Sequence, residues 1–260
     1  MNDGSGRMDV HAFFALLREE LEEIATAEKR KNMKTYSKIL AHIPHSSIQD
    51  YGYGWMGSGL MFPQVKQLTD WHTEILFSSH SPNVEAMVFP HSRFYLDVER
   101  MENDPMESVG QGRIYTEYEG RKRSKLTPED IDALNDMYRE WRQRCAERIT
   151  EDTLVVDCHS FTSSLAPEVS VCIGYNEDES KPSDEVIDYI IGKFKWFGYR
   201  VAVNEPCSHS IVFGGNHHSI MIALNKSLYM DEKTLEMDPK AYKVGGAINR
   251  IYDGLLNLQA

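Results

Sequence analysis

Hydrophobic residues recur along the chain with two spacings, one typical of helices and the other of strands. Apolar side chains every three or four residues predict five amphipathic helices. These cover residues 8–32, 64–79, 127–149, 183–197 and 238–258. Short apolar or alternating runs predict strands instead. They cover residues 36–44, 84–89, 93–98, 153–160, 169–174, 199–204 and 217–224.

The predicted strands alternate with the predicted helices over most of the chain. That order favours an α/β fold, in which helices flank a mostly parallel sheet. The polar stretch 101–124 predicts a long loop between two of these units. The sequence contains no internal repeat and no clear linker. The simplest organisation is one α/β domain over residues 36–260, preceded by an N-terminal helical extension over residues 1–35.

Charge narrows the range of partners. The 260 residues include 28 Lys and Arg against 40 Asp and Glu, which gives a formal net charge of −12. An acidic chain is poorly suited to nucleic acid or to an anionic membrane surface, because both attract positive charge. No apolar run approaches the roughly 20 residues of a membrane span. We therefore expect no nucleic acid and no membrane as partner.

The cysteines and the first residues bear on the cellular compartment. The chain has four cysteines, and no two of them form a C-x-x-C pattern that would indicate a zinc knuckle or a redox pair. So few thiols in a chain of this length fit a reducing compartment. The first residues lack the cationic start and apolar core of a secretory signal. We expect a cytoplasmic protein, and nothing in the sequence indicates an oligomer.

Two histidines stand near the carboxyl ends of predicted strands, where open α/β sheets bind ligands. His45 follows the strand 36–44, and His159 follows the apolar run 153–158 near the end of the strand 153–160. A rigid strand end can hold a metal ligand or a catalytic base, but a capping or loop histidine is an equally open interpretation. Asp157 precedes His159 by two residues and so shares its face of the strand. It either orients that histidine or caps a turn.

Three further candidate ligands, Asp70, His72 and Glu74, lie within five residues. In a regular helix Asp70 and Glu74 share a face while His72 points elsewhere, so Asp70 and His72 would not bind one ion. An ordinary surface helix explains the same pattern.

Two arginines, Arg93 and Arg100, flank a strand-like segment that contains Asp97. An arginine in a pocket can bind a carboxylate through two parallel hydrogen bonds. The alternative is that each arginine pairs with a surface acid.

Other motifs are weak or absent. His209, His217 and His218 lie near glycines, and a flexible loop is favoured over a metal site because no HExxH spacing occurs. The glycine-rich motifs of nucleotide-binding proteins and the GxSxG motif of serine hydrolases do not occur either.

Five segments together carry a family resemblance. They are PHSS (44–47), LTDWHTEILF (68–77), HSRFYLDVER (91–100), VVDCHS (155–160) and SLYMDE (227–232). In order and spacing they resemble the N-formylglutamate amidohydrolase family, over roughly residues 36–255. That family is similar to the zinc carboxypeptidases and to the succinylglutamate desuccinylase and aspartoacylase group. The resemblance implies a zinc-carboxypeptidase-like (phosphorylase/hydrolase-like) α/β fold, with a central mixed sheet of roughly eight strands.

The resemblance also implies an activity, namely hydrolysis of the amide of a small N-acyl (N-formyl-like) amino acid with one Zn²⁺. On this basis His45 and His159 are metal ligands. Asp70 is the candidate acidic ligand, with His72 and Glu74 as second choices. Catalytic zinc takes three N or O ligands and keeps one place for water.

The two arginines acquire a role in the same way. Arg93 and Arg100 would hold the substrate carboxylate, and Arg100 would also steady the oxyanion. A dicarboxylic substrate would suit two arginines. A chain of net negative charge needs such local positive charge to bind an anion.

Three departures from the family pattern affect this expectation. The family carries a Glu, similar to the general base of the zinc peptidases, at the position of Ala223. Losing a general base commonly lowers the rate by about 10²–10⁴-fold. Glu99 replaces an Asn of the family, and the segment 204–219 lacks the family's usual Arg, so the substrate can differ from formylglutamate.

Three hypotheses follow. The first is an active zinc amidohydrolase whose base comes from elsewhere, for instance from Glu74 or from the metal centre alone. The second is a catalytically impaired relative that acts as a metal-containing binding or regulatory protein, which the alanine at position 223 favours. The third is an α/β protein with structural histidines, against which the pair His45 and His159 argues.

Overall fold

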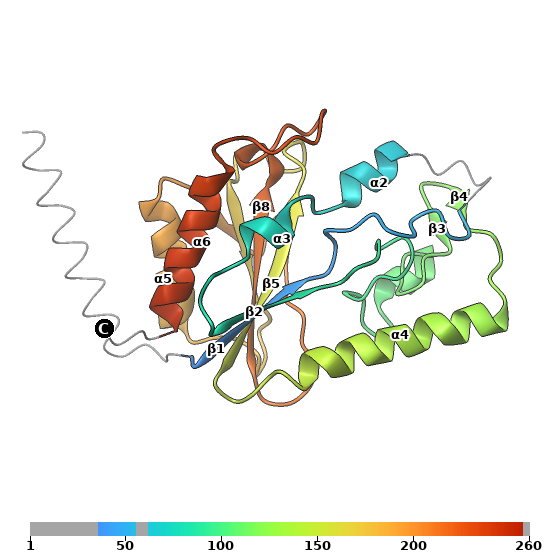
Figure 1. Cartoon of the computed structure of the whole chain (residues 1–260), viewed down its shortest axis with the longest axis horizontal. Coiled ribbons are helices and arrows are strands. Elements are labelled where there is room, and N and C mark those ends of the chain that lie inside the picture. The colour runs from blue at the N-terminus through green and yellow to red at the C-terminus, as the bar shows by residue number, and fades with distance from the viewer. Residues whose placement is uncertain (1–35, 56–61, 257–260) are drawn as a thin grey trace, which may run out of the picture.

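The computed structural model describes residues 36–55 and 62–256, with a six-stranded sheet at its centre (Figure 1). The helix expected over residues 8–32 and the extension 1–35 lie outside the described residues. The strands are β1 (Lys38–Ile43), β2 (Val84–Val88), β5 (Thr153–Phe161), β6 (Val171–Gly174), β7 (Val201–Val203) and β8 (His218–Asn225). They stand in the order β2-β1-β5-β8-β6-β7.

The sheet is mixed and mostly parallel, as predicted. Only the pairing of β6 with β8 is antiparallel among the neighbouring strands of this sheet. The expected number of roughly eight strands is wrong. The two remaining strands of the described residues, β3 (Glu117–Tyr118) and β4 (Arg121–Lys122), pair with each other in a separate ribbon. This ribbon and a 3₁₀ helix (Pro105–Val109) lie in the predicted loop 101–124.

Helices cover both faces of the sheet (Figure 1). The helices α3 (Thr73–Leu76), α5 (Asp184–Trp196) and α6 (Ala241–Leu255) lie on one face, and α4 (Pro128–Ala146) lies on the other. A capping box fixes the start of α4, because Thr127 and Asp130 each accept a hydrogen bond from the other's backbone N–H. Within residues 36–55 and 62–256, every helix is too short or too polar to cross a bilayer.

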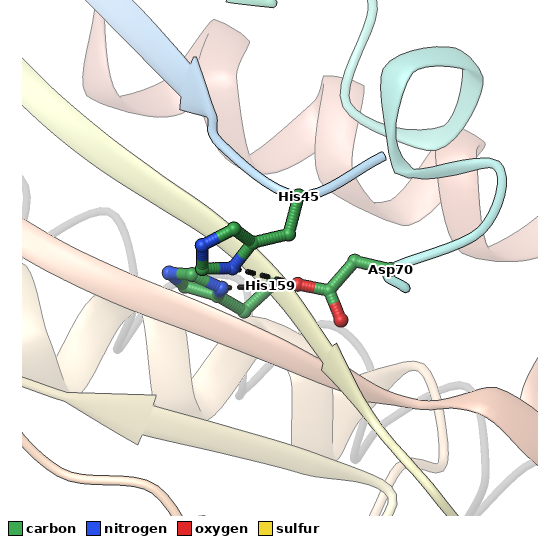
Figure 2. Close-up of side chains that lie close together, drawn as sticks. All are labelled: His45, Asp70 and His159. Atoms are coloured by element: carbon green, nitrogen blue, oxygen red, sulfur yellow. Dashed lines mark hydrogen bonds and ion pairs between the residues drawn. The ribbon is translucent and has the colours of Figure 1, made fainter. Parts of the chain in front are cut away.

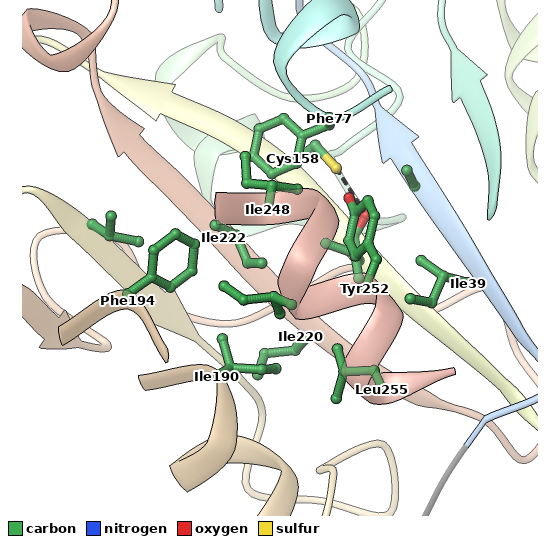
Figure 3. Packing of buried hydrophobic residues seen from close by; sticks show 14 of the residues in the cluster. Ile39, Phe77, Cys158, Ile190, Phe194, Ile220, Ile222, Ile248, Tyr252 and Leu255 are labelled. Atoms are coloured by element: carbon green, nitrogen blue, oxygen red, sulfur yellow. Dashed lines mark hydrogen bonds between the residues drawn. The ribbon is translucent and has the colours of Figure 1, made fainter. Parts of the chain in front are cut away.

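The largest hydrophobic core lies between the sheet and the helices α3, α5 and α6. Figure 3 shows Ile220 and Ile222 of β8 packed against Phe194 of α5 and Ile248 of α6. All four side chains are fully buried. Because successive residues of a strand point to opposite faces, the alternate side chains of β8 and β5 face the other layer. That second face carries the polar residues of the candidate site.

The helix expected over residues 64–79 is interrupted, which corrects the sequence prediction. It consists of α2 (Phe62–Leu68) and α3. Between them the N–H of Asp70 donates to the carbonyl of His45 at 2.9 Å, whereas in a regular helix it would bond to the carbonyl of residue 66. His72 then adopts a left-handed backbone with φ of 65° and begins α3.

Residues 93–98 form turns rather than the predicted strand. The Oγ of Ser92 accepts from the N–H of Phe94, and the Oδ1 of Asp97 accepts from the N–H of Glu99. Such local bonds from side chain to backbone favour turns over strand pairing. Phe94, Leu96 and Val98 are fully buried, which explains why the pattern alternates like that of a strand.

The strand order reverses between β1 and β5, the position at which α/β folds have a crevice outside the carboxyl ends of their strands. From β1 the chain continues to the neighbour on one side, β2, and from β5 it continues to β6 on the other side. Where the strand order reverses in this way, α/β proteins bind ligands at the carboxyl ends of the strands. His45 lies just beyond the end of β1, and His159 lies near the end of β5, two residues before Phe161. The fold therefore brings both candidate histidines to this crevice.

Candidate metal centre

His45, Asp70 and His159 converge at the crevice, where the two imidazole rings and the carboxylate point toward one another (Figure 2). Each residue offers one ligand atom, and these atoms all lie within 4.8 Å of one another. The Oδ2 of Asp70 is 3.1 Å from the Nδ1 of His159 and 3.8 Å from the Nδ1 of His45. The sequence singled out these three residues, and the structure brings all of them together.

Asp70 is held in place from three sides. Its backbone N–H bonds to the carbonyl of His45, and its own carbonyl accepts from the Oγ1 of Thr73 at 2.7 Å. The Oγ of Ser160 donates to the Oδ1 of Asp70 at 2.9 Å. The break between α2 and α3 thus has a function in the site, because it turns the second carboxylate oxygen of Asp70 toward the two histidines.

The far nitrogen of His45 is bound by a second carboxylate. Its Nε2 lies 2.8 Å from the Oδ1 of Asp97, which is fully buried. The Oδ2 of Asp97 accepts from Arg93 at 2.9 Å and from the hydroxyl of Tyr115 at 3.1 Å. A carboxylate that accepts from the outer nitrogen of a histidine fixes its ring and tautomer, and metal-ligating histidines usually have such a partner.

The far nitrogen of His159 meets two carboxylates. Its Nε2 is 3.3 Å from the Oδ1 of Asp157 and 3.7 Å from the Oε2 of Glu99. The spacing of two residues in β5 therefore places Asp157 beside His159, as one of the two open interpretations of the sequence expected. Glu99, which departs from the family's Asn, contributes a further negative charge at the edge of the site.

Electrostatics couples these groups strongly. Burial by itself would raise the pKa of Asp70, but hydrogen bonds and charge from His159 and His45 lower it below its usual range. Burial would likewise lower the pKa of His159, but Asp157, Asp70 and Glu99 outweigh it and raise that pKa well above its usual range. The three carboxylates around His159 therefore favour the protonated, positively charged form of its ring.

The atoms of the cluster fit a bound cation. Each Nε2 faces a carboxylate, so a neutral ring that keeps its proton there would offer the lone pair of Nδ1 to a cation. The Nδ1 of His45 is buried and has no hydrogen-bond partner. Two imidazole nitrogens and the Oδ2 of Asp70 form the set of three N and O ligands that catalytic zinc takes. The residues present therefore fit this metal.

The two second-choice ligands lie elsewhere. The Nε2 of His72 is 2.9 Å from the carbonyl oxygen of Leu235. One carboxylate oxygen of Glu74 is buried without a hydrogen-bond partner, and its charge acts on Tyr229. Neither residue belongs to a group of potential metal ligands within residues 36–55 and 62–256.

Arg93 and Arg100 both lie near Asp97, the carboxylate that bonds to the outer nitrogen of His45. Arg93 bonds to the Oδ2 of Asp97, and the Nε of Arg100 is 3.7 Å from the same oxygen. Arg100 also approaches Asp104 at 3.7 Å. Burial would lower the pKa of Arg93, but Tyr115, Asp97 and Asp70 raise it. Arg93 thus pairs with a buried acid, whereas Arg100 lies between the buried Asp97 and the partly exposed Asp104.

Ala223, at the position of the missing family glutamate, lies in register with His159 on β5 and with Cys172 on β6. Residues in register point to the same face of a sheet. Ala223 is fully buried and packs in an apolar cluster with Phe161, Cys172 and Met221. The wall next to His159 is therefore closed by hydrophobic side chains.

A pocket of about 210 Å³ lies at the carboxyl ends of β5 and β8. Its lining includes Trp71, which follows Asp70 directly, together with Thr162 and Lys226. The Nζ of Lys226 donates to the carbonyl of Gln67 at 2.8 Å. Burial lowers the pKa of Lys226 below its usual value, and the negative charge of Asp70 opposes this shift. The ammonium group therefore interacts electrostatically with Asp70.

Sequence reasoning missed the roles of Asp97 and His42. Asp97 was visible only as an acid between two arginines, because nothing local to it shows that it reaches His45. His42 is a fully buried polar residue within the apolar strand β1, where its Nδ1 is 3.1 Å from the Oδ1 of Asp157. A polar residue inside an otherwise apolar strand is the signal that could have identified it.

Comparison with known proteins defines the class to which this fold and site belong. The family profile of N-formylglutamate amidohydrolase matches residues 37–230, so the chain belongs to that family. The fold is similar to the crystal structure of N-formylglutamate amidohydrolase from Ralstonia eutropha JMP134, with a TM-score of 0.67 and 16% identity over 86% of this chain and 95% of that one. It is also similar to a gene product of Agrobacterium tumefaciens, with a TM-score of 0.61 and 17% identity over 87% and 91% of the two chains. A comparison with curated proteins gave no match.

Family membership supports a hydrolase of the N-formylglutamate amidohydrolase type that acts on a small amino acid derivative. The two structural similarities, at this level of identity, establish the fold.

Proposed function

We propose that this protein is a zinc-dependent hydrolase that cleaves the amide of an N-acyl, N-formyl-like amino acid of the dicarboxylic class. One observation carries the proposal. His45, Asp70 and His159 each offer one ligand atom within 4.8 Å of the others, and the Oδ2 of Asp70 lies 3.8 Å and 3.1 Å from the Nδ1 atoms of His45 and His159. Each outer histidine nitrogen meets a carboxylate, which supports a role for both rings as metal ligands.

The chain's own residues would divide the work as follows. His45, Asp70 and His159 would hold the metal, and Asp97 and Asp157 would keep the two rings in their binding orientation. Zinc, when bound, lowers the pKa of water and polarises a scissile carbonyl. Arg93 and Arg100 would attract the substrate carboxylate, and Arg100 would also stabilise negative charge that develops on the carbonyl oxygen.

Positive charge supports the choice of an anionic substrate. Two guanidinium groups, those of Arg93 and Arg100, lie on that side of the cluster, where Asp97 and Asp104 are the acids that pair with them. Lys226 adds an ammonium in the pocket next to Asp70. Because the protein as a whole is acidic, these groups provide the local attraction that an anion needs.

Proton transfer is where this chain departs from the family. Ala223 cannot accept a proton, and the side chains packed around it are apolar. Glu74 is the candidate substitute: one of its carboxylate oxygens is buried without a hydrogen-bond partner, and its charge acts on Tyr229, on which the Asp70 charge also acts. Alternatively, no side chain of the protein would act as general base, and the metal centre alone would activate the attacking water.

Metal content tests the site. Purified protein should contain about one zinc per chain. His45→Ala should lose it, whereas His80→Ala, which changes an exposed histidine outside the cluster, should keep it. Wild-type protein that holds no zinc after incubation with the metal and removal of the excess would refute the metal centre.

Turnover tests the activity. N-formyl-L-glutamate and other N-acyl-glutamates should release free amine, and neutral N-formyl amino acids should be poorer substrates by kcat/KM. Glu74→Gln should lower kcat if Glu74 is the base, while its zinc content should not change. Equal kcat/KM for anionic and neutral substrates would contradict the proposed substrate class.

A second candidate function rests on Ala223, namely that of an impaired relative that binds metal and ligand without turnover. Ala223→Glu would restore the family residue, and Ala223→Gln matches its size without a base. If zinc-loaded wild type is inactive and only the glutamate variant gains activity, this second function holds and the first fails.

A further inference from the structure

A second group of potential ligands lies directly behind the candidate metal centre. It comprises His42, Glu99 and Asp157, and its ligand atoms also lie within 4.8 Å of one another. His42 and Asp157 are fully buried and in register on neighbouring strands, β1 and β5. By composition this group resembles a second metal site, but its hydrogen bonds indicate a different role.

The decisive contact comes from α4. The indole Nε1 of Trp141 donates to the Nε2 of His42 at 3.2 Å. An indole N–H is a donor only, so the Nε2 of His42 must present its lone pair. The proton of the neutral ring therefore lies on Nδ1. A nitrogen that carries a proton cannot ligate a metal, which removes His42 as a ligand.

The proton on Nδ1 points at carboxylates. Nδ1 is 3.1 Å from the Oδ1 of Asp157 and 3.6 Å from the Oε2 of Glu99. The other oxygen of Asp157, Oδ2, accepts from the backbone N–H of Ile211 at 3.1 Å. Both oxygens of Asp157 are thus oriented by donors, and Oδ1 is left 3.3 Å from the Nε2 of His159.

We infer that His42, fixed by the indole N–H of Trp141, is a positioning residue that sets the tautomer of His159 through Asp157. In this chain of contacts, Trp141 dictates the tautomer of His42, and His42 and Ile211 fix the carboxylate of Asp157. Asp157 then accepts the Nε2 proton of His159, so that the lone pair which His159 can offer to a metal is the one on Nδ1, the nitrogen next to Asp70. The inference rests on the proposed function, because it assigns that lone pair to zinc.

Three variants separate this role from simple packing. His42→Leu removes both hydrogen bonds at similar volume. His42→Asn keeps an N–H at the place of Nδ1, so it can still donate to Asp157. Trp141→Phe removes only the indole N–H and keeps an aromatic ring, and Trp196→Phe is the matched control at an exposed tryptophan.

The first measurement is zinc affinity by competition with a chelator of known affinity. His42→Leu should bind zinc about 10–100-fold more weakly than wild type, the usual effect of losing an outer partner of a ligand. His42→Asn should stay close to wild type although it leaves a larger gap in the core, and Trp196→Phe should be unchanged. Equal loss in the leucine and asparagine variants would show that packing alone matters and would overturn the inference.

The second measurement reads the tautomer of His42 in metal-free protein, from long-range ¹H–¹⁵N correlations of labelled histidine. Wild type should show a protonated Nδ1 and an unprotonated Nε2, and Trp141→Phe should lose this single state. A protonated Nε2 in wild type would overturn the inference. So would two zinc ions per chain with one lost in His42→Leu. If wild type bound no zinc, the proposed function would fail, and this spectrum would still decide the assignment for His42.

Discussion

The Nε2 of His45 and the Oδ1 of Asp97 form a fully buried hydrogen bond of 2.8 Å between two segments that the sequence separates by 52 positions. Asp97 reaches His45 because residues 93–98 turn instead of forming a strand. The same carboxylate accepts from Arg93 and Tyr115, so its own position is over-determined. The position of Asp97 thus fixes the orientation of the His45 ring and also places a negative charge beside Arg93.

Removal of the Asp97 charge should weaken the metal site. In Asp97→Asn the acceptor opposite Nε2 of His45 is weakened, and we expect zinc affinity to fall about 10–100-fold. The affinity is measured by chelator competition. Asp132→Asn, an exposed residue of α4, is the matched control and should behave as wild type. An unchanged affinity in folded Asp97→Asn would show that Asp97 does not orient His45.

Acid should destabilise the protein through its buried carboxylates. Burial opposes it, but Arg93, His45 and Arg100 hold the pKa of Asp97 well below its usual range. A carboxyl group with a lowered folded pKa stabilises the fold fully above its unfolded pKa of about 3.9, and that stability is lost as the pH falls toward the folded pKa. Below about pH 3.9, each such group contributes a slope of about 1.4 kcal/mol per pH unit.

Urea unfolding at a series of acidic pH values checks this expectation. The free energy of unfolding of Asp97→Asn should be lower at neutral pH, because the buried Arg93 loses its partner. It should also depend less steeply on pH in the acid range by about 1.4 kcal/mol per unit. Parallel curves for wild type and variant would contradict the assigned role of Asp97.

Zinc affinity should rise with pH. In the metal-free protein, burial opposes but Asp157, Asp70 and Glu99 raise the pKa of His159 well above its usual range, so zinc must displace a proton. Release of one proton makes the affinity increase about tenfold per pH unit below the His159 pKa. Calorimetric titration in buffers of different ionisation enthalpy counts the released protons. A count near zero, with an affinity independent of pH, would contradict a protonated His159.

Two glycines should respond oppositely to alanine. A Cβ at Gly174 would lie 2.6 Å from the backbone carbonyl oxygen of His209 and against Met221, so Gly174→Ala should destabilise by about 1–3 kcal/mol. Gly192 lies inside α5 with open space around it, so Gly192→Ala should stabilise by about 0.5–1 kcal/mol. Chemical denaturation gives both values. Equal effects of the two substitutions would contradict the close packing at the end of β6.

Much of the fold follows from local pattern. Apolar runs such as that of β5 and the amphipathic repeat of α6 require burial on one or both faces wherever they lie in the chain, so the alternation of strands and helices was predictable. The pattern failed where side chains bond to nearby backbone. The side chains of Ser92 and Asp97 accept from nearby backbone N–H groups, so the strand-like segment 93–98 forms turns. The hydrogen bond from the N–H of Asp70 to the carbonyl of His45 interrupts the helix expected over residues 64–79.

The sequence by itself determined which side chains could take part in the chemistry of this protein. It identified His45, Asp70 and His159 as candidate ligands, from strand ends and family motifs, and Ala223 as the departure from the family pattern. Only the tertiary structure decided which nitrogen of each histidine faces the centre. That choice depends on partners from other segments, Asp97 for His45 and the contacts of Trp141 and His42 with Asp157 for His159. Hydrogen-bond direction is set by atoms that meet in space, and spacing along the chain does not encode it.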